Sequence, residues 1–135
     1  RKMELPVCDG GSAYGHPNVQ KMSQAVQAAH AILLALPIYN YDVNAAAKNL
    51  IELTGKAWTE KTVGFLCAAG GKNSYMSVMS LANSLMLDFR CLIIPRFVYA
   101  TGEDFTDDNT LHGTIQSRVE QLCNQTAKIA KALAI

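Results

Sequence analysis

The fold is decided by the stretch Ala31-Ile32-Leu33-Leu34-Ala35-Leu36-Pro37-Ile38-Tyr39-Asn40-Tyr41-Asp42. Its apolar run, residues 31–36, predicts a buried strand of a parallel sheet, because such strands are covered on both faces and read as continuous hydrophobic sequence. We expect Pro37 to end this strand and to open a loop with two tyrosines and Asn40. Open α/β sheets bind their ligands at the carboxyl ends of strands. The pattern therefore predicts a loop that meets a flat ligand.

The rest of the chain alternates between helical and strand patterns. Residues 1–17 read as a loop, and Pro17 suits the first position of a helix. A helix is predicted over 45–53, with Gly55 at its end, and a strand over 63–68. A loop over 69–74 and a helix over 75–87 come next, and then a strand over 91–94, which Pro95 stops and residues 97–99 can extend. The chain closes with a solvated acidic loop over 103–108 and a long helix whose apolar positions run from Leu111 to Leu133. This alternation implies right-handed crossovers and a parallel sheet in an α/β domain.

Composition and charge restrict the class of protein. The chain has 135 residues, of which 50% are hydrophobic and 17% charged, and its net charge is +1. Such a balance gives no basic field for nucleic acid or for an anionic membrane, and the 31–36 run is too short to cross a bilayer. We therefore expect a single compact domain without nucleic-acid or membrane partners.

Side chains that could act as nucleophiles or metal ligands are scattered. The four cysteines stand too far apart for a metal or redox motif: Cys8, Cys67, Cys91 and Cys123. Two of them fall in predicted strands, where free thiols are buried hydrophobes, and this favours a reduced, cytoplasmic location. The histidines have no partners at a catalytic spacing, and the acidic run fits no calcium loop. We expect no catalytic side chain and no metal site.

Four short motifs follow one another along the chain: Leu5-Pro6, Pro37-Ile38-Tyr39-Asn40-Tyr41, Ala47-Lys48-Asn49 and Gly70-Gly71. In this register the sequence resembles the NADPH-dependent FMN reductase family of flavodoxin-like proteins, which includes chromate, quinone and azo-dye reductases. The family has a leucine-proline stretch after its second strand and a Pro-x-Tyr-Asn loop after its third. A Leu-Lys-Asn helix start and a glycine loop after the fourth strand come next. The resemblance covers nearly the whole chain, with alanine at position 47 in place of leucine.

The resemblance implies a flavodoxin-like three-layer α/β sandwich with a parallel sheet in the order 2-1-3-4-5. Family members begin with a strand, a Gly-Ser-x-Arg-x-x-Ser phosphate loop, a helix and a second strand, and this sequence contains none of these. We therefore expect one flavodoxin-like domain over residues 1–135 that is N-terminally incomplete. Its 31–36 strand should have an exposed, aggregation-prone edge. Without the phosphate loop, the chain alone is expected to bind FMN poorly.

By resemblance, two segments would hold the flavin. They are Pro37, Ile38, Tyr39, Asn40 and Tyr41 at the ring, and Ala69, Gly70, Gly71, Lys72 and Asn73 at its pyrimidine end. Glycines let a backbone approach a ligand, and N–H groups at a helix start favour negative charge. The alternatives are ordinary packing for the tyrosines, a simple turn for the glycines and a solvated side chain for Lys72. Lys48 and Asn49 are expected to serve as caps and surface pairs.

The resemblance further implies an FMN-dependent oxidoreductase. It would use NADPH or NADH to reduce flavin, a quinone or a similar small-molecule acceptor by hydride transfer through the flavin. A site without acid or base side chains suits this reaction, because the cofactors carry the chemistry. The alternative is a non-catalytic flavodoxin-like oligomeric module, or an electron carrier, that lacks the flavin phosphate loop.

Two further expectations concern partners and the nicotinamide cofactor. Family members are homodimers or homotetramers, so the helices over 45–53 and 75–87 are candidates for an interface, with intramolecular packing as the alternative. A phosphate of NADPH needs a nearby cation, and Arg90 and Arg96 flank the third predicted strand. Spacing alone does not choose between them.

Overall fold

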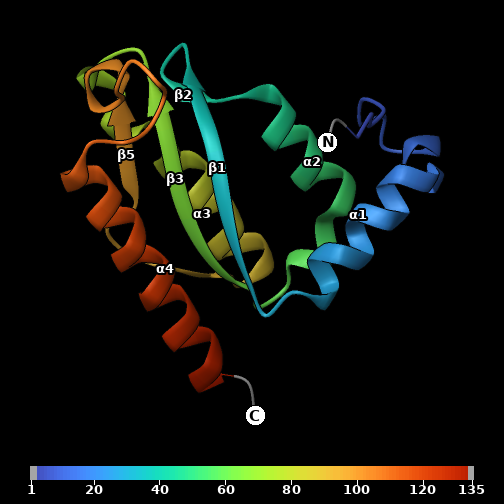
Figure 1. The fold of residues 1–135 in the computed structure, drawn as a ribbon. Helices are drawn as coiled ribbons and strands as arrows, with labels where there is room; N and C mark the ends of the chain where they lie inside the picture. The colour runs from blue at the N-terminus through green and yellow to red at the C-terminus, as the bar shows by residue number, and fades with distance from the viewer. Residues whose placement is uncertain (1–2, 134–135) are drawn as a thin grey trace.

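The computed structural model describes residues 3–133, which form a sheet with helices on both faces (Figure 1). The helices are α1 (Pro17–Ala28), α2 (Ala45–Thr54), α3 (Met79–Phe89) and α4 (Gly113–Leu133). The strands are β1 (Ala31–Tyr39), β2 (Asp42–Val43), β3 (Thr62–Ala69), β4 (Leu92–Ile93) and β5 (Val98–Thr101). Four 3-10 helices connect them: η1 (Ser12–Gly15), η2 (Gly55–Trp58), η3 (Lys72–Val78) and η4 (Gly102–Asp104). In this part of the chain no helix is both long and apolar enough to cross a membrane.

β3 is the central strand of the sheet. On one side it pairs in parallel with β1, from Ala31 opposite Thr62 to Pro37 opposite Ala68. On the other side it pairs in parallel with β4 and then with β5, so that these two short strands act as one interrupted strand. Among the named strands of residues 3–133, β2 alone runs antiparallel, as the return of a hairpin from β1. The predicted parallel α/β arrangement is confirmed, while the order of the full family sheet stays a prediction.

Each face of the sheet has its own hydrophobic core. The larger core lies between the sheet and the helices α1, α2 and α3, with Trp58, Phe65 and Leu85 almost fully buried. The smaller core lies under α4, where Ile115 and Leu122 pack on β5. Two cores on opposite faces give three layers, as expected from the sequence.

The expected end of the first strand at Pro37 is wrong, because β1 continues to Tyr39. Proline has no N–H for a ladder bond, and it is tolerated at the edge of a sheet. Within residues 3–133, β1 has β3 on one side and only the two residues of β2 on the other. The hairpin then turns at Asn40 and Tyr41, which both have positive φ, 51° and 64°.

The structure also places different boundaries in the segment where a loop over 69–74 and a helix over 75–87 were predicted. Ala69 is the last residue of β3, and Lys72 already begins η3, which leads into α3 at Met79. The tight first turns are closed by the Ser77 hydroxyl, which donates to the carbonyl of Ser74 at 2.6 Å. The segment therefore forms 3-10 turns with a kink at Ser74, whose φ is −94° and ψ 22°, where a loop and the start of an α-helix were expected.

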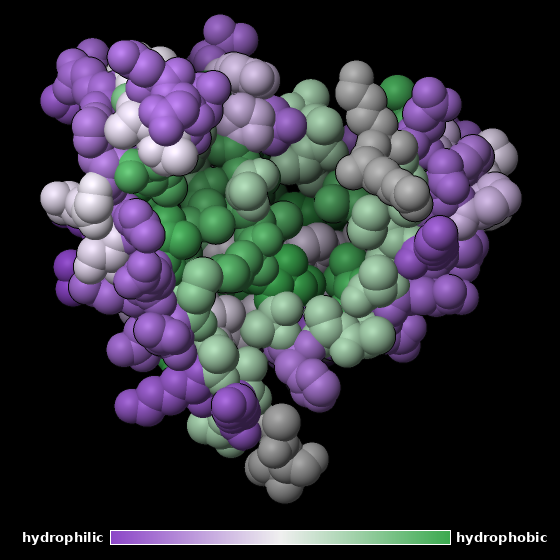
Figure 2. All heavy atoms as spheres, in the orientation of Figure 1, coloured by the Kyte–Doolittle hydropathy of each residue, from purple (hydrophilic) through white to green (hydrophobic). Residues whose placement is uncertain are grey.

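One face of β1 and β3 is open beside α4. The Leu33 side chain is 39% exposed, and hydrophobic side chains form a continuous area across the middle of this face (Figure 2). A hollow of about 410 Å³ lies here, with these residues along its wall: Ala35, Leu36, Pro37, Leu66, Cys67, Ala68, Val98, Ala100, Phe105, Leu111, Ile115 and Val119. The hydrogen-bonding edge of β1 is a separate feature: within residues 3–133 it is paired only with the two residues of β2, so most of it is open as expected, and its tendency to aggregate stays a prediction.

We predict that Gly64→Ala destabilises the protein, because side chains of β1 and α4 already occupy the space beside Gly64 of β3. A Cβ at this position would lie 2.9 Å from Leu33 Cδ2, 3.2 Å from Leu122 Cδ1 and 3.2 Å from Thr126 Oγ1. Such overpacking costs about 1–3 kcal/mol, measurable by urea unfolding. Gly113→Ala is the control, since a Cβ there meets no atom within 4 Å. Equal stability of Gly64→Ala and the wild type would contradict this account of the packing.

Candidate functional site

The ends of three parallel strands meet at one edge of the sheet. Pro37 stands opposite Ala68, and Ala68 stands opposite Ala100, so the segments that follow them lie at the same level. These segments are the hairpin 39–43, the glycine segment 69–73 and the turn 101–104, and we call them together the carboxyl edge. Sheets of this kind bind ligands at this edge.

The hairpin presents its tyrosines to solvent. Tyr39 is 62% exposed and Tyr41 is 60% exposed, so neither ring is used for core packing. Positive φ at two successive positions is the geometry of a type I′ turn, which favours Asn and Gly and disfavours a tyrosine. The Asp42 carboxylate fixes the return strand by accepting from the Val43 N–H at 2.8 Å and from the Ser80 hydroxyl at 3.3 Å.

The two other residues predicted for this segment lie differently. Ile38 is buried in the larger core, so its side chain is directed away from the surface. Pro37 lines the apolar hollow beside α4. Of the five residues predicted here from the sequence, the structure thus brings Tyr39, Asn40 and Tyr41 to the exposed end of the hairpin.

The glycine segment offers bare backbone. A Cβ on Gly70 or Gly71 would meet no atom within 4 Å, and within residues 3–133 neither N–H has a hydrogen-bond partner. The Gly71 carbonyl, by contrast, accepts a hydrogen bond of 2.6 Å from the Tyr99 hydroxyl. Tyr99 is held in turn by Tyr75, whose ring makes an edge contact with it at 5.5 Å between centroids. The backbone of the glycine segment is therefore held in place through the Gly71 carbonyl, while Gly70 and Gly71 are exposed to solvent.

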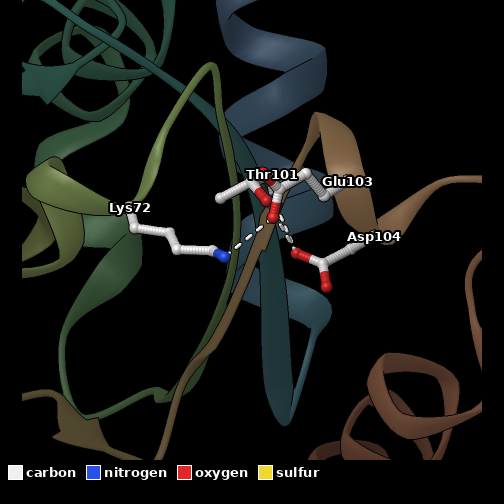
Figure 3. Close-up of polar contacts among 4 residues, drawn as sticks. All are labelled: Lys72, Thr101, Glu103 and Asp104. Atoms are coloured by element: carbon white, nitrogen blue, oxygen red, sulfur yellow. Dashed lines mark hydrogen bonds and ion pairs between the residues drawn. The ribbon is translucent and has the colours of Figure 1, made fainter.

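A polar link joins the glycine segment to the turn after β5 (Figure 3). Lys72 Nζ lies 2.7 Å from Glu103 Oε2, and this contact raises the pKa of Lys72. Asp104 accepts from the N–H of Thr101 at 2.7 Å and from its hydroxyl at 3.0 Å, and the N–H bond lowers the pKa of Asp104. Lys72 is thus a solvent-exposed ion-pair partner, and Asn73 continues η3 beside it.

Residues 103–108 are mostly exposed, as expected, but their first two residues, Glu103 and Asp104, are held by specific contacts in η4. Thr101 and Asp104 form a capping box, and the Thr-x-x-Asp spacing in the sequence is a signal for it. The ion pair between Lys72 and Glu103 had no such signal, since it depends on β5 pairing with β3. Sequence reasoning also missed Tyr99, whose role follows from the same pairing.

The Lys-Asn motif of α2 has a structural use other than the expected caps and surface pairs. Asn49 Oδ1 accepts from the Cys8 N–H at 2.8 Å, and Asn49 Nδ2 donates to the Pro6 carbonyl at 2.9 Å. This side chain ties the segment before η1 to α2. Lys48 is exposed on the same helix.

Two of the four cysteines lie in the larger core. Cys67 in β3 is buried, and burial raises its pKa to about 11, so its thiol stays protonated near neutral pH. Cys91 is buried as well, and its Sγ lies 3.1 Å from the Trp58 carbonyl oxygen. Both thiols are packing groups, as expected. The edge can bind and align a ligand through aromatic rings and backbone N–H groups.

Several oxidoreductases have a similar sequence or a similar fold. An NAD(P)H-dependent FAD/FMN reductase of Geobacillus thermodenitrificans (strain NG80-2) is 28% identical over 123 residues, which are 88% of this chain and 66% of that protein. An oxidoreductase from Corynebacterium diphtheriae has a similar structure, with a TM-score of 0.74 and 16% identity over 88% of this chain and 65% of that one. FerB, an NAD(P)H:(acceptor) oxidoreductase flavoenzyme from Paracoccus denitrificans, gives a TM-score of 0.69 and 17% identity over 95% and 74%.

The chain spans slightly under two thirds of the Geobacillus and Corynebacterium proteins. At these low identities the structural likeness concerns the fold, and it confirms the expected flavodoxin-like α/β class. The model of the NADPH-dependent FMN reductase family matches residues 1–106, which include the hairpin, the glycine segment and the turn after β5. The chain belongs to the NADPH-dependent FMN reductase family.

Proposed function

We propose that the carboxyl edge binds the ring of FMN and that the protein reduces flavin, a quinone or a similar acceptor with NADPH or NADH. One observation carries this proposal. Two exposed tyrosines follow β1, and a glycine backbone where an added Cβ would meet no other atom follows β3, the strand paired with β1. The family to which the chain belongs supports the same reaction class. The name of the Geobacillus relative includes both flavin and nicotinamide cofactors, which is consistent with the proposal.

The residues at the edge fit a flavin ring chemically. The isoalloxazine system is flat, with an apolar end and a pyrimidine end rich in hydrogen-bond acceptors. Tyr39 and Tyr41 have exposed aromatic faces for the apolar part. The N–H groups of Gly70 and Gly71 are exposed and have no hydrogen-bond partner within residues 3–133, so they can serve as donors for the pyrimidine end. In such a site the protein has to place the ring and stabilise its charge, and no side chain has to transfer a proton.

When bound, the flavin would supply the acceptor for hydride and the donor for the second substrate. Gly70 and Gly71 would stabilise the negative charge of the reduced ring through their N–H groups. The Tyr99 hydroxyl keeps this backbone in place through the Gly71 carbonyl, and the pair of Lys72 with Glu103 ties the segment to η4, the turn after β5. The hairpin would fix the orientation of the ring.

Self-association is a further part of the proposal. Of the two helices predicted as interface candidates, α3 has two faces, since Leu81 and Leu85 are buried while Met79, Met86 and Leu87 are exposed. An apolar row of this kind supports a homodimer or homotetramer through α3. The expected alternative, intramolecular packing, describes the other face of the same helix.

The reaction is tested by NADPH oxidation, followed by absorbance, with purified protein and added FMN. We expect oxidation that requires both protein and flavin and that saturates with FMN concentration. NADH in place of NADPH compares the two nicotinamide cofactors. Oxidation at the same rate with and without FMN, or no oxidation at any flavin concentration, would contradict the proposed function.

Tyr41→Gly separates binding from folding at the hairpin. Glycine relieves the positive φ of 64°, so stability should be unchanged or higher by roughly 1 kcal/mol. Loss of the ring should weaken riboflavin binding severalfold, as measured by fluorescence quenching. Tyr14→Ala is the control, because Tyr14 is an exposed tyrosine of η1, outside the carboxyl edge. A folded Tyr41→Gly protein that binds riboflavin like the wild type would remove Tyr41 from the site.

A further inference from the structure

A concave surface lies between α4 and the corner that joins β4 to β5. Its volume is about 640 Å³, and its walls combine residues 94–97, one face of α4 and Tyr75 of η3. Ile94 and Leu122 line it and are buried, with 2% and 3% of their surface exposed, so they form an apolar floor. The other lining residues are mainly polar or aromatic. We call this surface the α4 groove.

The α4 groove is lined by cations and by no carboxylate. Arg96 comes from the corner, and Arg118 and Lys128 come from α4. All three are exposed, and none takes part in the ion pairs found within residues 3–133. Glu120, the one acidic residue after position 108, does not line the groove. The groove is therefore a local positive region on a chain whose net charge is only +1.

The polar residues of α4 run along the length of the groove. They stand at every third or fourth position and so lie on one face of the helix: Arg118, Gln121, Gln125 and Lys128. From position 118 to position 128 the row covers about 15 Å along the helix axis. About five residues of an extended chain cover the same distance. A ligand that contacts the whole row is therefore long and narrow, as a peptide segment is.

Two aromatic side chains line the same groove. The rings of Tyr75 and Phe97 are stacked, with 4.8 Å between centroids and 30° between planes. Tyr75 is 47% exposed, so part of its ring is available to a ligand. Aromatic residues and arginine are enriched in protein–protein interfaces, and tyrosine and arginine often provide much of the binding energy there. The composition of the α4 groove is therefore typical of a protein interface.

We propose that the α4 groove binds a short acidic peptide segment of a partner protein, with an aromatic or large aliphatic side chain between its carboxylates. The carboxylates would pair with Arg96, Arg118 and Lys128, and clusters of arginine are a common means of holding acidic segments. The apolar side chain would pack on the exposed part of Tyr75 and over the apolar floor. The amide side chains of α4 can both donate to and accept from the peptide backbone.

The arrangement of charge favours a peptide over nucleic acid. Two neutral amides, Gln121 and Gln125, separate the cations at the ends of the row. A nucleic-acid backbone has a negative charge on every nucleotide and is bound by dense basic patches on proteins with a clear excess of positive charge. A net charge of +1 and three cations around an apolar floor suit a few carboxylates with an apolar side chain among them.

The test is a fluorescence-anisotropy titration of the purified protein with a labelled synthetic peptide, Asp-Glu-Phe-Glu-Asp with blocked ends. The groove variant, Arg118→Gln/Lys128→Gln, removes two cations from α4, and glutamine is a good helix former. The control variant, Lys21→Gln/Lys131→Gln, removes the same charge at exposed positions outside the groove. We expect the groove variant to bind the peptide about tenfold more weakly than the wild type, and the control variant to bind it like the wild type.

A neutral peptide shows whether charge is what the groove recognises. Asn-Gln-Phe-Gln-Asn has nearly the same shape without the carboxylates, and it should bind the wild type far more weakly than the acidic peptide. Similar affinity of the wild type for both peptides overturns the proposal. Equal affinity of the groove variant and the control variant for the acidic peptide, or no binding to the wild type at millimolar concentration, overturns it as well.

Two further measurements identify another occupant if there is one, and we expect a negative result in both. A short labelled oligothymidylate that binds more tightly than the peptide, and that the groove variant loses, would replace the acidic partner by nucleic acid. Self-association in sedimentation that the groove variant loses and the control variant keeps would assign the groove to a second copy of the chain. All of these results are independent of flavin-dependent NADPH oxidation, because the groove uses no residue of the carboxyl edge.

Discussion

Between Ala31 and Pro37, β1 pairs in parallel with β3, and this ladder sets the position of every other part of the molecule. It leaves one edge of β1 open, presents one face to the larger core and brings the ends of β1 and β3 to the same level. β5 extends the alignment by pairing Ala68 with Ala100. A shift of one residue would turn the apolar side chains of β1 to the opposite face. The carboxyl edge is therefore a consequence of register, with few side chains dedicated to it.

Much of the fold could be predicted because its signals are local. The apolar run at 31–36, the glycine at 55 and the apolar periodicity of the last helix each depend on neighbouring residues, and each was confirmed. The errors came from long-range context. Pro37 stays in a strand because the outer side of β1 is an edge, and Lys72 finds Glu103 because β3 and β5 are neighbours. The two segments expected to hold the flavin followed from motif order, while their geometry required the sheet.

Positive φ occurs at several non-glycine residues of the described chain, and two of them form the turn of the hairpin. Asn40 and Tyr41 have φ of 51° and 64°, and the others are Glu60, Arg90, Arg96 and Asn109. Tyrosine is a poor choice for this conformation. At the hairpin, the strained Tyr41 has an exposed aromatic ring. The cores under α3 and α4 supply the stability that holds these positions.

The central claim is that one edge of the sheet holds the flavin ring through the hairpin and the glycine backbone. The most direct measurement is residue-resolved NMR of the isotope-labelled protein during titration with riboflavin, which contains the ring without the phosphate. The account predicts that the amide signals of Asn40, Tyr41, Gly70 and Gly71 move together and saturate at one affinity. Riboflavin binding that leaves these four signals unchanged and moves others would contradict it.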